Sequence, residues 1–226
     1  MQCVILAAGK GTRMLPITET IPKPLVSVLD KPVIDHIIDS LPETITELIV
    51  VVGYKADILK KHLGAMYKNR KVTYVTQDKL LGTAAALNLC KDILEEKFLV
   101  MPGDDIHGKE AIEELVSNQS SLAVSPSEHP ERFGVVVTDK DGFVTEIIEK
   151  PENPTSNLVS TGAMVLTSDI FSYSGPLHSS GEYYLTDMIT NYTKTHKMRA
   201  VRQEVWLPIG YPEDIITAES RLRLCD

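Results

Sequence analysis

The chain has 226 residues and carries 23 Lys and Arg against 31 Asp and Glu, a net charge of −8. This negative balance disfavours a nucleic-acid-binding surface, which needs clustered positive charge. No apolar run approaches the ~18 residues of a membrane-spanning helix, and the first residues lack the charged segment of a signal peptide. We therefore expect a cytoplasmic protein with neither a nucleic-acid nor a membrane partner.

Cysteine and histidine positions argue against a metal or disulfide framework. Cys3, Cys90 and Cys225 lie far apart, and the histidines show no metal-ligand spacing. We expect the histidines to be surface or incidental residues.

The first predicted element is a buried strand over residues 2–7, which ends in a run of small residues. The backbone N–H groups of Ala8 to Thr12 are then available to face a ligand, and such a loop suits phosphate. Arg13 and Lys23 add two positive charges beside it, and Pro22 and Pro24 should hold Lys23 in an extended segment. A plain tight turn is the alternative for the glycine pair alone.

The rest of the chain alternates apolar runs with amphipathic stretches. Further strands are predicted at 47–52, 72–75, 97–101, 121–125, 134–138, 143–148, 162–166 and 199–204. Helices are predicted at 33–40, 55–66, 83–94, 109–118, 185–195 and 212–223. This alternation is typical of a mostly parallel sheet flanked by helices, with a hairpin at the Asp139-Lys140-Asp141-Gly142 turn.

Ligands of such sheets bind at the carboxyl ends of the strands. The glycine-rich loop follows one strand end, and Gly103-Asp104-Asp105 follows another. The acidic pair suits a hard cation, although an Asp-rich turn is the alternative.

An ordered set of motifs resembles the sugar-phosphate nucleotidyltransferases, the pyrophosphorylases that make nucleoside-diphosphate sugars. The motifs are Leu6 to Met14 with Pro22-Lys23-Pro24, Gln77 with Leu81-Gly82-Thr83-Ala84, Gly103-Asp104, Phe133-Gly134-Val135-Val136, Glu149-Lys150-Pro151, Thr161-Gly162, Gly181 to Asp187, and Trp206 to Asp214. The resemblance covers nearly the whole chain. It implies an α/β, Rossmann-like, three-layer fold with an open, mostly parallel mixed sheet. It also implies a single domain, with a nucleotide-binding half of about 1–125 and a sugar-phosphate-binding half of about 126–226, and no C-terminal β-helix domain.

On the nucleotide side, the resemblance implies that the glycine-rich loop wraps a triphosphate. The implied nucleotide-binding residues are Leu6, Ala7, Ala8, Gly9, Gly11, Thr12, Arg13, Gln77, Gly82, Thr83 and Gly103. The amide of Gln77 offers a donor and an acceptor, which match the edge of uracil or thymine, so UTP or dTTP is the expected donor. A solvated loop amide is the alternative for Gln77.

On the sugar side, the resemblance implies a hydroxyl ligand at Glu149 and a phosphate ligand at Lys150. The remaining implied sugar-phosphate-binding residues are Gly134, Thr161 and Gly162. An exposed ion pair at a strand end is the alternative for Glu149 and Lys150. We expect Thr186-Asp187 to supply the N-cap of the helix at 185–195.

The implied catalytic residues are Arg13, Lys23 and Asp104, with Asp104 holding Mg²⁺. The family commonly has Trp-x-Asp in its last sheet segment, with the aspartate as second metal ligand, but this chain has Pro208 there. Glu204 or Asp105 could substitute, or Asp104 could act with phosphates and water alone. We expect Asp214 to start the final helix.

The expected reaction transfers a nucleoside monophosphate from UTP or dTTP to a sugar 1-phosphate and releases pyrophosphate. Glucose 1-phosphate is favoured, because Ser160 stands where N-acetylglucosamine-specific relatives tend to carry asparagine. Other sugar 1-phosphates (N-acetylglucosamine, mannose type), cytidylyl transfer, and a non-catalytic nucleotide-sugar sensor stay open. So does a homo-oligomeric state.

Overall fold

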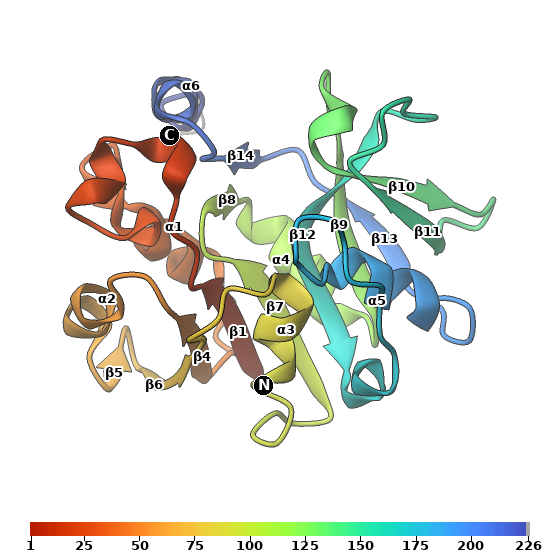
Figure 1. Ribbon diagram of the computed structural model, residues 1–226, viewed down its shortest axis with the longest axis horizontal. Helices are drawn as coiled ribbons and strands as arrows, with labels where there is room; N and C mark the ends of the chain where they lie inside the picture. Colours follow the sequence, from red (N-terminus) through yellow and green to blue (C-terminus); the bar gives the residue numbers. More distant parts are fainter. Residues whose placement is uncertain (225–226) are drawn as a thin grey trace.

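In the computed structural model, which describes residues 1–224, a mixed sheet lies between two layers of helices (Figure 1). Its strand order is β11-β10-β12-β7-β1-β4-β6-β5, with β9 paired to β12 and β13 paired to β9. The strands are β1 (Gln2–Ala7), β4 (Glu47–Val52), β5 (Met66–Tyr67), β6 (Arg70–Thr76), β7 (Lys97–Pro102), β9 (Ser121–Pro126), β10 (Gly134–Thr138), β11 (Val144–Glu149), β12 (Leu158–Thr167) and β13 (Arg199–Arg202). The predicted fold class is confirmed.

The centre of the sheet is parallel: β1 pairs with β4 and β7, and β4 pairs with β6. Parallel strands run in the same direction, so all four strands have their carboxyl ends at the same edge of the sheet. The segments that follow Ala7, Val52, Thr76 and Pro102 are thereby brought together.

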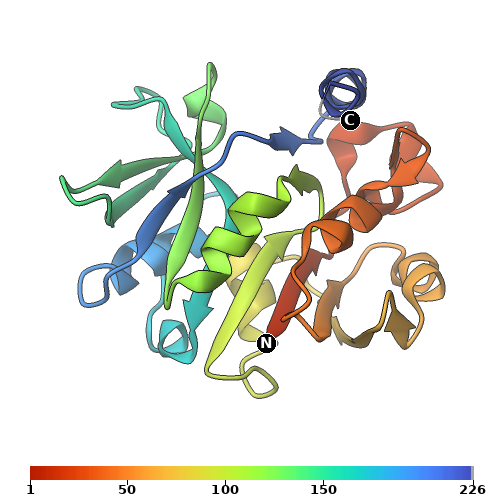
Figure 2. The ribbon, with the colours of Figure 1, turned by 180° about the vertical axis from the view of Figure 1, so that it is seen from behind.

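Side chains along β1 alternate between the two faces of the sheet. Cys3 and Ile5 belong to the core under α1 (Val33–Ser40), α2 (Ala56–Leu63), α4 (Lys109–Ser117) and α6 (Pro212–Leu222). Val4 belongs to the core under α3 (Thr83–Asn88) and α5 (Leu185–Tyr192). Figure 1 shows the face covered by α3 and α5, and Figure 2 shows α4 and α1 on the opposite face. Both faces of the central strands are therefore buried, as their continuous apolar runs predict.

Two short strand pairs and several single turns were not predicted. The pairs are β2 (Ser27–Val28) with β3 (Lys31–Pro32), and β8 (Asp105–His107) with β14 (Trp206–Pro208). The single 3₁₀ turns are η1 (Thr12–Met14), η2 (Ile17–Glu19), η3 (Lys23–Leu25), η4 (Pro130–Arg132) and η5 (Ser168–Ser172). Two- and three-residue strands carry too little periodicity to be recognised in a sequence.

Several details of the sequence predictions are wrong, including the ends of α2 and α5, which lie at Leu63 and Tyr192, three residues before the predicted ends. Helix α3 ends at Asn88 rather than at 94, and α5 has Tyr184 at its N-cap, so Thr186-Asp187 do not cap it. The Leu185 N–H instead donates to the Thr83 hydroxyl at 3.0 Å, which supplies a side-chain acceptor from another helix. His107 is only 3% exposed, so it is not a surface residue.

Asp214 lies at the start of α6, close to its predicted role: the helix begins at Pro212, and the Asp214 carboxylate accepts the Tyr211 N–H. Within residues 1–224, no helix has the length and apolar character needed to cross a membrane. Cys225 lies outside the described residues.

Candidate active site

A cleft of about 710 Å³ opens at the carboxyl ends of the parallel strands. Nearly all the residues predicted to bind substrate line it: Leu6, Ala7, Ala8, Gly9, Gly11, Thr12, Arg13, Lys23, Gln77, Gly82, Thr83, Asp104, Gly134, Glu149, Lys150, Thr161 and Gly162. Gly103 does not line the cleft. Its N–H donates to the Leu6 carbonyl at 3.0 Å, and an added Cβ would lie 2.8 Å from that oxygen. Gly103 therefore lets the turn after β7 approach β1 closely.

The glycine-rich loop after β1 leaves space and unused donors at the cleft. A Cβ added to Gly9 would have no neighbour within 4 Å. Among residues 1–224, no protein acceptor takes a hydrogen bond from the N–H of Gly9, Lys10 or Gly11. Gly11 has a φ of 63°, in the left-handed region that glycine adopts readily. Backbone donors that converge in this way form a concavity for anions.

Lys23 forms an ion pair with Asp104 in the cleft. The lysine side chain is 10% exposed and the aspartate side chain 37% exposed. The prediction that Lys23 is extended is wrong: Pro22 is extended, but Lys23 begins the 3₁₀ turn η3. Lys23 packs against the loop, since a Cβ on Gly11 would lie 3.0 Å from the Lys23 Cβ. The turn thus holds one ammonium group beside the anion-binding loop.

Asp105 lies directly opposite Pro208 in the antiparallel β8–β14 pair. Its carboxylate accepts a hydrogen bond from Trp206 Nε1 at 3.0 Å. Burial, and secondarily the neighbouring Asp104 carboxylate, raises the pKa of Asp105 to about 8. Glu204 is exposed and borders a separate hollow of about 240 Å³ beside Leu222, so Glu204 is wrong as a candidate ligand in the cleft.

The carboxyl groups in the cleft fit Mg²⁺ when the substrate supplies further oxygen ligands. Within the described chain, no group of three or more His, Cys, Asp or Glu side chains could hold a metal. Asp104 and Asp105 are adjacent carboxylates in the cleft. Mg²⁺ commonly takes one or two carboxylates and completes its shell with phosphates and water, so the residues fit this ion in the presence of a nucleotide.

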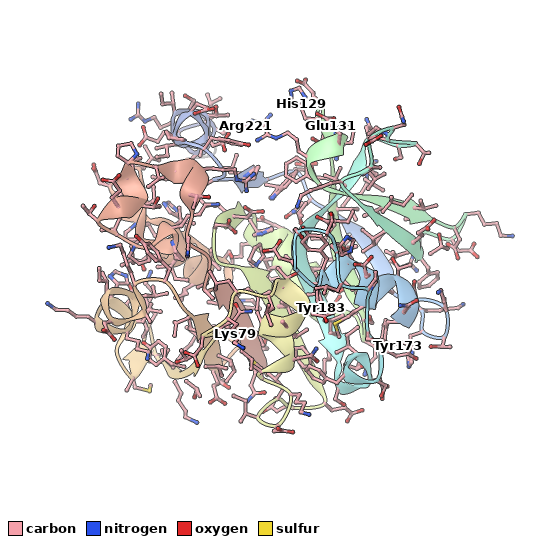
Figure 3. All side chains as sticks on the ribbon, in the orientation of Figure 1. Lys79, His129, Glu131, Tyr173, Tyr183 and Arg221 are labelled. Atoms are coloured by element: carbon pink, nitrogen blue, oxygen red, sulfur yellow. The ribbon has the colours of Figure 1, made fainter. Side chains whose placement is uncertain are left out.

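Gln77 is 6% exposed, so the alternative of a solvated loop amide is wrong. Its Nε2 donates to the Gly82 carbonyl at 3.2 Å, which leaves its second amide hydrogen and its oxygen for a ligand. The Gly82 segment is in turn bonded to the segment before α5: the Tyr183 N–H donates to Leu81 and the Ala84 N–H donates to the Tyr183 carbonyl. Figure 3 shows Lys79 and Tyr183, from these two segments, on one face of the molecule.

Glu149 ends β11 on the other side of the cleft, and Lys150 directly follows it. Lys150 Nζ lies 3.1 Å from Glu149 Oε1 and 5.0 Å from the centroid of the Tyr184 ring. Lys150 has a φ of 43°, so the chain turns at this residue. The hydroxyl of Thr186 donates to Glu149 Oε2 at 3.0 Å, which fixes the carboxylate. Glu149 and Lys150 therefore form an ion pair and also line the cleft.

The cleft also contains residues that the sequence predictions did not assign to it. These include Lys10, Arg132, Glu182, Tyr184, Leu185 and Thr186. Arg132 directly precedes the Phe133-Gly134 motif, and this position in the sequence could have identified it as a cleft residue. Thr186 lies in the Gly181 to Asp187 motif but was assigned to a helix cap.

Comparison with known proteins agrees with this geometry. The sequence model of the nucleotidyl transferase family matches residues 2–223. The UTP–glucose-1-phosphate uridylyltransferase AglF of Haloferax volcanii is 39% identical over 99% of this chain and 97% of its own. The bifunctional protein GlmU of Methanococcus maripaludis strain C7 is 34% identical over 98% of this chain, which spans about half (54%) of GlmU.

A solved structure gives the same fold. The protein described as a glucose-1-phosphate thymidylyltransferase from Bacillus anthracis, crystallised with sucrose, has a TM-score of 0.87 and 30% identity, and the match covers 99% of this chain and 95% of that one. A family match over nearly the whole sequence and relatives above 30% identity lead to one conclusion: the chain belongs to the nucleotidyl transferase family.

Proposed function

We propose that this protein transfers a uridylyl or thymidylyl group from UTP or dTTP to a sugar 1-phosphate, with glucose 1-phosphate as the favoured acceptor, and releases pyrophosphate. One observation carries the proposal. A single cleft joins the anion-binding loop and Gln77 on one side to Glu149 and Lys150 on the other. The full-length similarity to AglF supports UTP and glucose 1-phosphate. We also propose that the reaction takes place in the cytoplasm between small soluble substrates.

In this reaction an oxygen of the sugar phosphate attacks the α-phosphorus as pyrophosphate leaves. The attacking phosphate is already anionic at neutral pH, so no general base is needed. The main obstacle is repulsion between the two substrates, roughly 1 kcal/mol per charge pair in water and several times that in a protein cleft. Arg13, Lys23 and Lys150 line the cleft and would offset this repulsion while holding the two phosphates in line.

We propose that Mg²⁺ binds with the nucleotide at Asp104, and that Asp105, opposite Pro208, is the second carboxyl group, which would release its proton when the ion binds. The ion would supply charge neutralisation at the phosphates. Asp104 would hold it while Lys23 stays beside the same phosphates. When EDTA is added to the assay to chelate divalent cations, we expect turnover to stop. It should return when Mg²⁺ is added in excess over EDTA.

The deciding experiment measures pyrophosphate release with UTP, dTTP and CTP, each against glucose 1-phosphate, N-acetylglucosamine 1-phosphate and mannose 1-phosphate. We expect turnover with UTP or dTTP and glucose 1-phosphate, and its loss in Lys23→Ala. Preference for CTP would contradict the role of Gln77 in base recognition. Ligand-induced thermal stabilisation without turnover, across the whole panel and at several Mg²⁺ concentrations, would instead indicate a sensor.

A further inference from the structure

Tyr211 brings together two arginines from opposite sides of the cleft. The Cζ atom of Arg13, in η1, lies 5.1 Å from the centroid of the Tyr211 ring. The Cζ atom of Arg132, in η4, lies 5.0 Å from the same centroid. Guanidinium groups stack favourably on aromatic rings, so one ring at the start of α6 contacts both cations.

Neither arginine has a carboxylate partner among residues 1–224. Among the described residues, Arg13 and Arg132 form no ion pair within 4.0 Å, and both are exposed. Asp214 also lines the cleft, but its Oδ2 accepts the N–H groups of Gly210 at 2.8 Å and Tyr211 at 2.7 Å. That carboxylate therefore anchors the Tyr211 backbone. The two guanidinium groups keep ten potential N–H donors and two positive charges at one place in a protein of net charge −8.

Both arginines line the cleft, and Tyr211 is not among the lining residues. Arg13 lies two residues after Gly11 of the anion-binding loop. Arg132 is held at the other side by its neighbour Phe133, whose ring packs edge-on against Trp206 at a centroid distance of 4.9 Å. His129 and Glu131 are close to Arg132 in the sequence. In Figure 3, these two residues lie along the same edge of the molecule as Arg221 of α6. The η4 segment and α6 thus close one end of the cleft.

We propose that Arg132 joins Arg13 in binding the diphosphate that becomes the leaving group, and that Tyr211 positions both guanidinium groups. The inference rests on the proposed function and adds a residue from the sugar side to the binding of pyrophosphate. Two like charges near one ring repel each other, and a diphosphate between them converts this repulsion into paired, bidentate hydrogen bonds. The sugar phosphate is the other source of the same anion, but Lys150 already lies beside Glu149 at that end.

The test runs the reaction in reverse, with magnesium pyrophosphate and UDP-glucose, in the wild type and in Arg132→Ala, Arg132→Lys, Tyr211→Phe and Tyr211→Leu. For Arg132→Ala we expect the KM for pyrophosphate to rise at least about tenfold, since a hydrogen bond to a charged group is lost. Arg132→Lys should recover only part of this, because an ammonium group cannot bind in the same fork. In Tyr211→Leu the KM for pyrophosphate should rise, whereas Tyr211→Phe, which keeps the ring, should lie nearer the wild type.

Arg202→Ala is the matched control, because Arg202 is an exposed arginine on β13 outside the cleft. Calorimetric titration of each variant with magnesium pyrophosphate measures the affinity without turnover. An unchanged KM and an unchanged pyrophosphate affinity in Arg132→Ala would overturn the proposal and leave a stacking role only. A raised KM for glucose 1-phosphate with an unchanged KM for pyrophosphate would overturn it in favour of the sugar phosphate. If the wild type itself uses no nucleotide sugar, the proposed function fails, while the titration still reports on Arg132.

Discussion

The Lys23 ammonium is paired with the Asp104 carboxylate in the cleft, although 81 residues separate them in the chain. The two opposite charges compensate each other in a partly buried place where a lone ion would be costly. In the proposed reaction, the phosphates of a bound nucleotide would face Lys23, and a cation on those phosphates would face Asp104. The pair therefore prepares the two charges that the proposed reaction requires.

Removal of the positive side chain of either Lys23 or Arg13 should stop catalysis while the protein stays folded. We expect Lys23→Ala and Arg13→Ala each to lower kcat/KM by at least about 100-fold, because a preorganised charge at the reacting phosphates is lost. Circular dichroism and thermal unfolding should remain close to the wild type. Lys91→Ala, at an exposed lysine outside the cleft, is the control and should retain full activity. Near-normal turnover in either cleft variant would contradict the assigned roles.

Gly82→Ala should destabilise the protein and weaken nucleotide binding. Gly82 has a φ of 93°, and an added Cβ would lie 2.4 Å from the Tyr183 carbonyl oxygen. Strain of this kind typically costs about 1–3 kcal/mol, and relieving it would separate the two segments that hold Gln77. Urea unfolding measures the first effect and the KM for UTP the second. Gly9→Ala is the matched comparison for stability, since its Cβ would meet nothing within 4 Å. Equal stability losses in the two variants would contradict this reasoning.

Thr186 should act on the sugar through Glu149. In Thr186→Ala the hydrogen bond to Glu149 Oε2 is lost, so we expect the KM for glucose 1-phosphate to rise a few-fold, in line with about 1 kcal/mol for one hydrogen bond. The KM for UTP should stay unchanged. Thr186→Ser keeps the hydroxyl and should restore the wild-type KM for the sugar phosphate. A loss in both variants alike would indicate that packing of the methyl group matters instead.

His107 should make the fold sensitive to acid. Burial lowers the pKa of His107 from 6.5 to about 4, although its Nδ1 contacts Gln203 Oε1 at 3.1 Å. Between these values the unfolded chain binds a proton that the folded chain does not, so stability falls as the pH drops below 6.5. We expect this residue alone to lower the free energy of unfolding by about 2 kcal/mol from pH 7 to pH 5. Urea unfolding of the wild type and His107→Asn at several pH values measures it; equal pH slopes would contradict the prediction.

The layered architecture was predictable because its signals are local. The apolar runs at β1, β4 and β7 are long enough to identify buried strands, and α1 begins and ends as predicted at Val33 and Ser40. Helix α3 shows the limit: its predicted last turns, up to residue 94, are separate turns in the structure, since helical periodicity does not mark where tertiary packing ends a helix.

The fold class could be predicted from the sequence, and nearly all the residues predicted to bind substrate line the cleft, because parallel strands end at one edge of the sheet and several motifs follow a strand end. Which groups contact one another could be seen only in the folded chain. The tertiary structure paired Lys23 with Asp104, set Asp105 opposite Pro208, and brought Arg132 to the ring that Arg13 already contacts. Such contacts join segments about 80 to 200 residues apart, and they depend on loop paths and short strands that leave no periodic signal in the sequence.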